Sequence, residues 1–86
     1  MEPQVTVYGT AWCEVTREFR IYLTRQKIDF VFRNVENNLD DKAAAMTMNN
    51  GDYQTPVIKV GERPMRNPSR GVLERELKKQ GILESE

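Results

Sequence analysis

The sequence predicts an α/β fold in which a mixed four-stranded sheet is flanked by helices in the order β-α-β-α-β-β-α. Three observations support this prediction. Short β-branched and aromatic runs alternate with segments of helical periodicity, a hairpin pattern with a central glycine follows, and a capped helix comes last. A strand, a helix and a second strand form a right-handed parallel unit, which the following helix and hairpin complete.

The first half of the chain predicts two strands and two helices. Val5–Tyr8 alternates β-branched and aromatic residues as a strand does, and Gly9 ends it. Residues 14–26 have apolar side chains along one helical face. Ile28–Val35 changes to a period of two and predicts a second strand. Residues 39–49 are rich in alanine and methionine and predict a second helix. The apolar residues along this face are Val15, Phe19, Tyr22 and Leu23.

A hairpin is predicted after a turn cluster at residues 49–52. Residues 56–66 contain two strand-like runs joined by a two-residue turn at Gly61 and Glu62. Pro64 has no amide hydrogen to donate to a ladder, so its strand is expected at the edge of the sheet.

The last predicted helix begins at the segment Asn67–Ser69. Asn67 or Ser69 can cap it, and Pro68 suits the first helical position. Its apolar face contains Val72, Leu73, Leu77 and Ile82. Gly81 is expected to end it, because glycine readily adopts the left-handed conformation that follows a helix.

Composition limits the classes of function. The 86 residues predict one domain, residues 1–86, and its single cysteine cannot close an internal disulfide. The absence of histidine argues against a metal site, and 13 basic residues balance 13 acidic ones, which argues against nucleic-acid binding. No apolar run approaches the ~20 residues of a membrane span, and no signal pattern starts the chain. We therefore expect a cytoplasmic monomer with a reduced thiol.

Cys13 is the candidate functional residue, because it lies between the first predicted strand and the first predicted helix. The free N–H groups at a helix N-terminus stabilise a thiolate, and ligands usually bind α/β sheets at this end of the strands. Thr16 can offer its hydroxyl to the sulfur and Arg17 adds positive potential, whereas the Glu14 carboxylate opposes ionisation. The alternative interpretation is a small buried side chain without chemistry.

The motif Trp12-Cys13-x-x-Thr16 after a strand, with Thr55-Pro56 at the start of the third strand, resembles the glutaredoxins of the thioredoxin fold. The resemblance extends over nearly the whole chain. It implies a cis Thr55–Pro56 peptide bond opposite Cys13. In that arrangement the Thr55 backbone pairs with the cysteinyl part of a thiol substrate. Trp12 can shield the thiol or touch a partner, and the alternative is an ordinary half-buried aromatic beside a loop.

The segment Asn67-Pro68-Ser69 is similar to the mycoredoxin-like branch of the glutaredoxins, as is Tyr8–Cys13. This similarity implies that Asn67, Pro68 and Ser69 contact the γ-glutamyl or sugar end of a low-molecular-weight thiol. The N–H groups at a helix N-terminus suit a carboxylate. An ordinary helix cap is the alternative.

Two departures from the family narrow the implied chemistry. Dithiol members have a second cysteine where this chain has Thr16, so Cys13 cannot resolve its own mixed disulfide. The iron–sulfur-carrying branch uses Cys-Gly-Phe-Ser, which Glu14-Val15-Thr16 does not match. We therefore expect a monothiol protein with no bound cofactor and no metal.

The predicted function is that of a monothiol thiol–disulfide oxidoreductase in electron transport and cell redox homeostasis. Its partners would be proteins that carry mixed disulfides, and its cosubstrate glutathione or a thiol such as mycothiol. Two alternatives remain open. One is a binding module of the same fold without redox activity. The other is a relative of the N-terminal domain of glutathione transferases, which would need a further helical domain.

Overall fold

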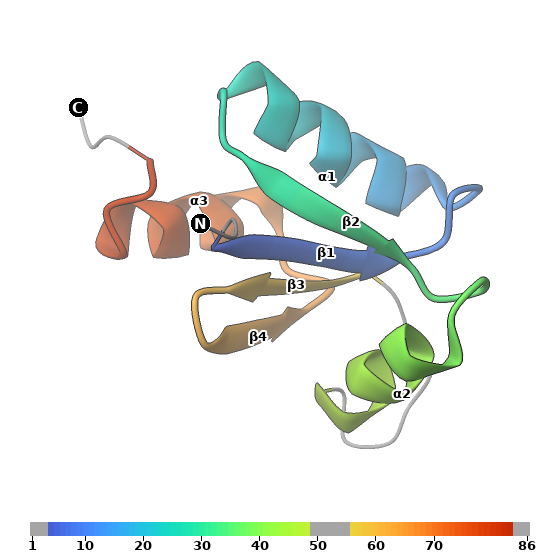
Figure 1. Ribbon diagram of the computed structural model, residues 1–86. Coiled ribbons are helices and arrows are strands. Elements are labelled where there is room, and N and C mark those ends of the chain that lie inside the picture. The colour runs from blue at the N-terminus through green and yellow to red at the C-terminus, as the bar shows by residue number, and fades with distance from the viewer. Residues whose placement is uncertain (1–3, 49–55, 84–86) are drawn as a thin grey trace.

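The computed structural model describes residues 4–48 and 56–83, and its elements follow the predicted order (Figure 1). The fold class predicted from the sequence is therefore confirmed. The predicted turn at residues 49–52 lies outside the described residues. The elements are β1 (Val5–Gly9), α1 (Glu14–Arg25), β2 (Phe30–Asn34), α2 (Leu39–Met48), β3 (Val57–Val60), β4 (Arg63–Arg66) and α3 (Arg70–Lys79).

The sheet has the strand order β2-β1-β3-β4. β1 is parallel to β2 and antiparallel to β3, and β4 is antiparallel to β3. Pro64 therefore lies on an edge strand, as predicted, opposite Lys59. Gly61 begins the β3–β4 turn with a φ of +60°, a conformation in which glycine meets no steric cost.

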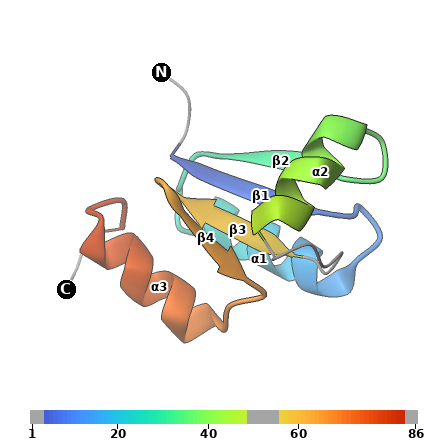
Figure 2. The same ribbon diagram turned by 90° about the horizontal axis from the view of Figure 1, so that it is seen from below.

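Helices lie on both faces of the sheet. α2 covers the face opposite α1, as Figures 1 and 2 show. α1 and α3 pack on the same face and share the main hydrophobic core with the strands. The core residues are Val5, Val7, Phe19, Tyr22, Leu23, Ile28, Ile58, Val60, Met65, Leu73 and Leu77. In the part of the chain that the structure describes, no helix has the length and apolar character needed to cross a membrane.

Two predicted core positions are wrong, because Val15 and Val72 are each 43% exposed. The buried face of α1 is centred on Thr16, Phe19 and Leu23, which recur at intervals of three and four residues. Val15 lies at the border of this face. Val72 similarly precedes the buried Leu73 on α3.

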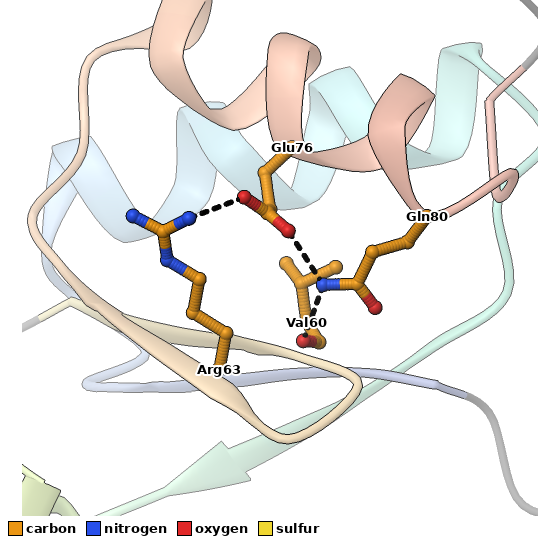
Figure 3. A network of polar contacts seen from close by, with 4 residues as sticks. All are labelled: Val60, Arg63, Glu76 and Gln80. Carbon is orange, nitrogen blue, oxygen red and sulfur yellow. Dashed lines mark hydrogen bonds and ion pairs between the residues drawn. The ribbon is translucent and has the colours of Figure 1, made fainter.

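A polar network fixes α3 on the β3–β4 hairpin (Figure 3). Arg63 Nη1 donates to Glu76 Oε1 at 2.6 Å, and Gln80 Nε2 donates to Glu76 Oε2 at 2.7 Å and to the Val60 carbonyl at 3.0 Å. The hydrogen bond from Gln80 is the main cause that lowers the pKa of the Glu76 carboxyl, and the Arg63 charge adds to it against the effect of burial. The network thereby holds α3 against the β3–β4 hairpin.

Candidate functional site

Cys13 is the N-cap residue of α1 and follows β1 after a short turn. The Cys13 N–H donates to the Thr10 carbonyl at 3.2 Å, which closes the turn. The Cys13 carbonyl accepts from the Arg17 N–H at 3.0 Å, which starts the helix. Backbone angles of φ −75° and ψ 121° are those of an N-cap. The side chain is partly buried at the end of the helix where free N–H groups gather.

The pKa of the Cys13 thiol is lowered from its ordinary value, as predicted. The hydrogen bond from the Thr16 side chain is the largest cause, and the backbone N–H groups of Thr16 and Val15 add to it. Burial and the Glu14 carboxylate act in the opposite direction. Hydrogen-bond donors at the helix start therefore favour the thiolate, which is the nucleophilic form of cysteine.

The Arg17 charge is not among the causes of the pKa shift of the Cys13 thiol, so the role predicted for it there stays a prediction. Its side chain is exposed and lines a groove along α1. A solvated charge one turn away acts weakly, since water screens it. The thiolate is stabilised by short-range hydrogen bonds instead.

Thr16 is fully buried, and among the described residues its hydroxyl has no hydrogen-bond partner of good geometry, so it is free to donate to the Cys13 sulfur and lower its pKa. Its side chain packs against Gly9, the last residue of β1. Gly9 was expected to end the strand before this position, but it belongs to the ladder opposite Asn34. The missing side chain at Gly9 leaves the space that Thr16 occupies.

The substitution Thr16→Val should raise the pKa of the Cys13 thiol, because valine has a similar shape but no hydroxyl. The pH profile of Cys13 alkylation should therefore move to higher pH. The free energy of unfolding should not fall, since no other hydrogen bond is lost. Thr24→Val, which removes an exposed hydroxyl from the same helix, is the matched control. An unchanged alkylation profile for Thr16→Val would contradict the assigned role.

Pro56 lies at the same end of the sheet as the Cys13 turn. Tyr8 pairs with Val57 in the antiparallel β1–β3 ladder, so Pro56 comes beside the end of β1. Its side chain is fully buried, and its carbonyl accepts from the Asn67 N–H at 2.8 Å. Thr55 and the predicted cis bond to Pro56 lie outside the described residues.

Ser69 caps α3, since its Oγ accepts from the Val72 N–H at 3.2 Å. Of the two predicted caps, the structure therefore selects Ser69. Pro68 is not in the first helical position, which belongs to Arg70, because the cap residue Ser69 stands between them. Asn67 is exposed and has a φ of +37°, a left-handed conformation that asparagine tolerates better than most residues. Its backbone bond to Pro56 brings this segment to the Cys13 end of the sheet.

Two residues beside Cys13 complete the site. Trp12 is 76% exposed, so its indole is available to a bound molecule. Thr10 was not among the predicted site residues, yet it is only 3% exposed and its carbonyl fixes the Cys13 amide. The spacing of three residues, typical of a turn, is the one sequence feature that could have indicated this contact.

Comparisons with known proteins agree with this geometry. A model of the glutaredoxin family matches residues 5–65. A glutaredoxin from Archaeoglobus fulgidus is 19% identical, with a TM-score of 0.70 over 85% of this chain and 84% of that chain. Buckwheat glutaredoxin in complex with glutathione is 14% identical, with a TM-score of 0.71 over 94% of this chain and 76% of that chain. No curated protein sequence matches the chain.

Proposed function

The chain belongs to the glutaredoxin family, and from this premise we propose that it is a monothiol oxidoreductase that uses glutathione to reduce protein mixed disulfides. The observation that carries the proposal is the Cys13 thiol of lowered pKa at the N-terminus of α1. Such thiols are the nucleophiles of thiol–disulfide exchange. Glutathione is the first choice of cosubstrate, because the buckwheat glutaredoxin of the same fold was solved with it.

The proposed reaction has two exchange steps. In the first, the Cys13 thiolate attacks the glutathione sulfur of a mixed disulfide, so that a Cys13–glutathione disulfide forms and the protein thiolate leaves and takes up a proton. In the second, the thiolate of another glutathione attacks the glutathione sulfur of this adduct. Oxidised glutathione is released and the Cys13 thiolate is regenerated. The disulfide thus passes from the protein to glutathione: the protein sulfur becomes a thiol, and the one incoming glutathione is oxidised together with the glutathione that the mixed disulfide carried.

We assign the thiol-binding residues to the surface around Cys13. Pro56 and Asn67 are joined by a backbone hydrogen bond, which supports a continuous surface from the start of β3 to the start of α3. Pro68 and Ser69 continue it, and the N–H groups of the first turn of α3 suit a carboxylate of the thiol. In this proposal the Thr55 backbone pairs with the cysteinyl group and Trp12 covers the sulfur.

The single cysteine of the chain supports the monothiol cycle, because Thr16 occupies the position of a second, resolving thiol. The segment Asn67–Ser69 also supports a place in the mycoredoxin-like branch, for which mycothiol would replace glutathione. We further propose that residues 1–86 form one domain that acts as a monomer in the cytoplasm, where the pool of small thiols is reduced.

Incubation with oxidised glutathione, followed by mass spectrometry, tests the function. We expect one glutathione per chain, and excess reduced glutathione should remove it. Protein whose Cys13 has first been alkylated is the control and should gain no mass. The same experiment is then run with oxidised mycothiol. The thiol whose adduct forms and is released faster is the preferred cosubstrate. A folded protein that forms no adduct with either thiol would be a binding module without redox activity.

A further inference from the structure

A second surface feature lies beside the Cys13 turn, on the side of α1 that faces the edge strand β2. Figure 1 shows α1 running alongside this strand. An open groove of about 650 Å³ follows the helix there. It starts at Ala11, two residues before Cys13, and it continues to Arg25 at the C-terminal end of the helix. The groove is distinct from the proposed thiol site, which lies between Cys13, Pro56 and α3.

Three arginines line this groove, namely Arg17, Arg20 and Arg25, and no carboxylate lines it. Among the described residues, none of the three takes part in an ion pair, since the ion pairs found there are Arg63–Glu76 and Lys78–Glu74. The chain has as many acidic as basic residues, so this cluster is a local separation of charge. The three guanidinium groups therefore carry charge that no carboxylate among the described residues neutralises in an ion pair.

Neighbouring groups shape the groove as well. The exposed carboxylates nearest in sequence are Glu14 and Glu18 on the adjoining side of α1 and Asp29 before β2. The guanidinium of Arg20 lies 4.1 Å from the centre of the Phe32 ring, a cation–π contact that restrains it beside the sheet. Ile21 is 40% exposed and supplies an apolar part of the lining. A mixed lining of this kind suits a peptide better than a bare inorganic anion.

We propose that this groove binds an acidic, extended segment of the protein substrate whose mixed disulfide reacts at Cys13. The inference rests on the proposed function, because it concerns the choice of substrate for that reaction. A substrate joined to Cys13 would have its chain within reach of Ala11, where the groove begins. The positive lining then favours acidic residues near the reacting cysteine of the substrate.

The dimensions fit such a segment. From Arg17 to Arg25 the helix rises eight residues, or ~12 Å at the α-helical rise. An extended peptide covers this length with about four residues, and its alternate side chains point to the same side. β2 is an edge strand, so one side of its backbone is open to pairing with an incoming strand. Acidic residues at alternate positions would thus face the arginines of α1.

Fluorescence anisotropy of a labelled, cysteine-free peptide with alternating glutamates tests this inference. The full chain should bind the peptide, and the Kd should rise with salt. Arg20→Gln/Arg25→Gln should weaken binding about fivefold, as expected for two exposed charge pairs. Arg75→Gln/Lys79→Gln, which removes the same charge from the exposed side of α3, is the matched control and should bind like wild type. A peptide with glutamine in place of glutamate should not bind.

Turnover of a mixed disulfide of cysteine and glutathione, measured in parallel, separates the two proposals. The Arg20→Gln/Arg25→Gln variant should turn it over at the wild-type rate, since this small substrate does not reach the groove. If wild type and this variant bound the peptide equally and turnover were intact, peptide binding in the groove would be rejected and the proposed oxidoreductase function would stand. If wild type did not turn over this mixed disulfide, both the proposed function and this use of the groove would be rejected. Tighter binding of a single-stranded oligonucleotide through the same arginines would replace the peptide with nucleic acid.

Discussion

Cys13→Ser is expected to reduce thiol–disulfide exchange to the uncatalysed rate, because Cys13 is the single thiol of the chain. A serine hydroxyl does not ionise near neutral pH and cannot form the disulfide intermediate. The Thr16 hydroxyl and the helix N–H groups would remain in place but would have no thiolate to stabilise. The measurement is the rate at which a mixed disulfide releases glutathione in the presence of excess thiol.

The same variant should keep its fold. Cys13 makes no side-chain capping hydrogen bond at the start of α1, whereas serine is among the favoured N-cap residues. The free energy of unfolding should therefore be equal to that of wild type or higher. Catalysis by Cys13→Ser above the uncatalysed rate would assign the activity to another group and would contradict the nucleophile proposed here.

Local sequence patterns predicted the elements of this fold because each pattern reflects a local cause. The period of two in Val5–Tyr8 and the helical period of residues 14–26 come from which side chains face the sheet core. The position of Cys13 between those two segments was also enough to place it at a helix N-terminus. Its lowered pKa follows from that location, so this part of the site could be inferred without a structure.

The rest of the site depends on contacts between segments that are far apart in the sequence, and local patterns do not show which of them meet. The register of β1 against β3 places Pro56 beside the end of β1, and a backbone bond then brings Asn67 to the same place. Val15 was assigned to the core because it is apolar, but the helix places it at the border of the buried face. Arg17 was assigned to the thiol because it is near in sequence, whereas the causes that lower the pKa of the Cys13 thiol are hydrogen bonds from Thr16 and Val15.

The contact between Gly9 and Thr16 is a further example, and it leads to a strong prediction. A β-carbon at Gly9 would lie 2.5 Å from Thr16 Oγ1 and 2.6 Å from Thr16 Cγ2, far inside the ~3.5–4.0 Å of ordinary carbon contact. Thr16 is fully buried in the first turn of α1, so it cannot turn into solvent. An added methyl group must therefore displace the start of α1 from the end of β1.

Gly9→Ala should lower the free energy of unfolding by about 1–3 kcal/mol, the usual effect of overpacking a buried site. It should also raise the pKa of the Cys13 thiol, because the Thr16 hydroxyl moves away from the sulfur. Urea unfolding measures the first effect and the pH profile of alkylation measures the second. Gly71→Ala is the control, since a β-carbon there meets nothing within 4 Å. That variant should be stabilised by about 0.4–1 kcal/mol, as alanine favours the helix.

The double variant Gly9→Ala/Thr16→Ala distinguishes overpacking from any other effect of the new methyl group. Removal of the Thr16 side chain beyond its β-carbon frees the space that the added methyl group needs. Most of the lost stability should then return, whereas the pKa of Cys13 should stay raised because the hydroxyl is absent. If the double variant were as unstable as Gly9→Ala, the contact would not be the cause. Recovery of stability without recovery of the thiol pKa would show that Gly9 and Thr16 together fix the environment of Cys13.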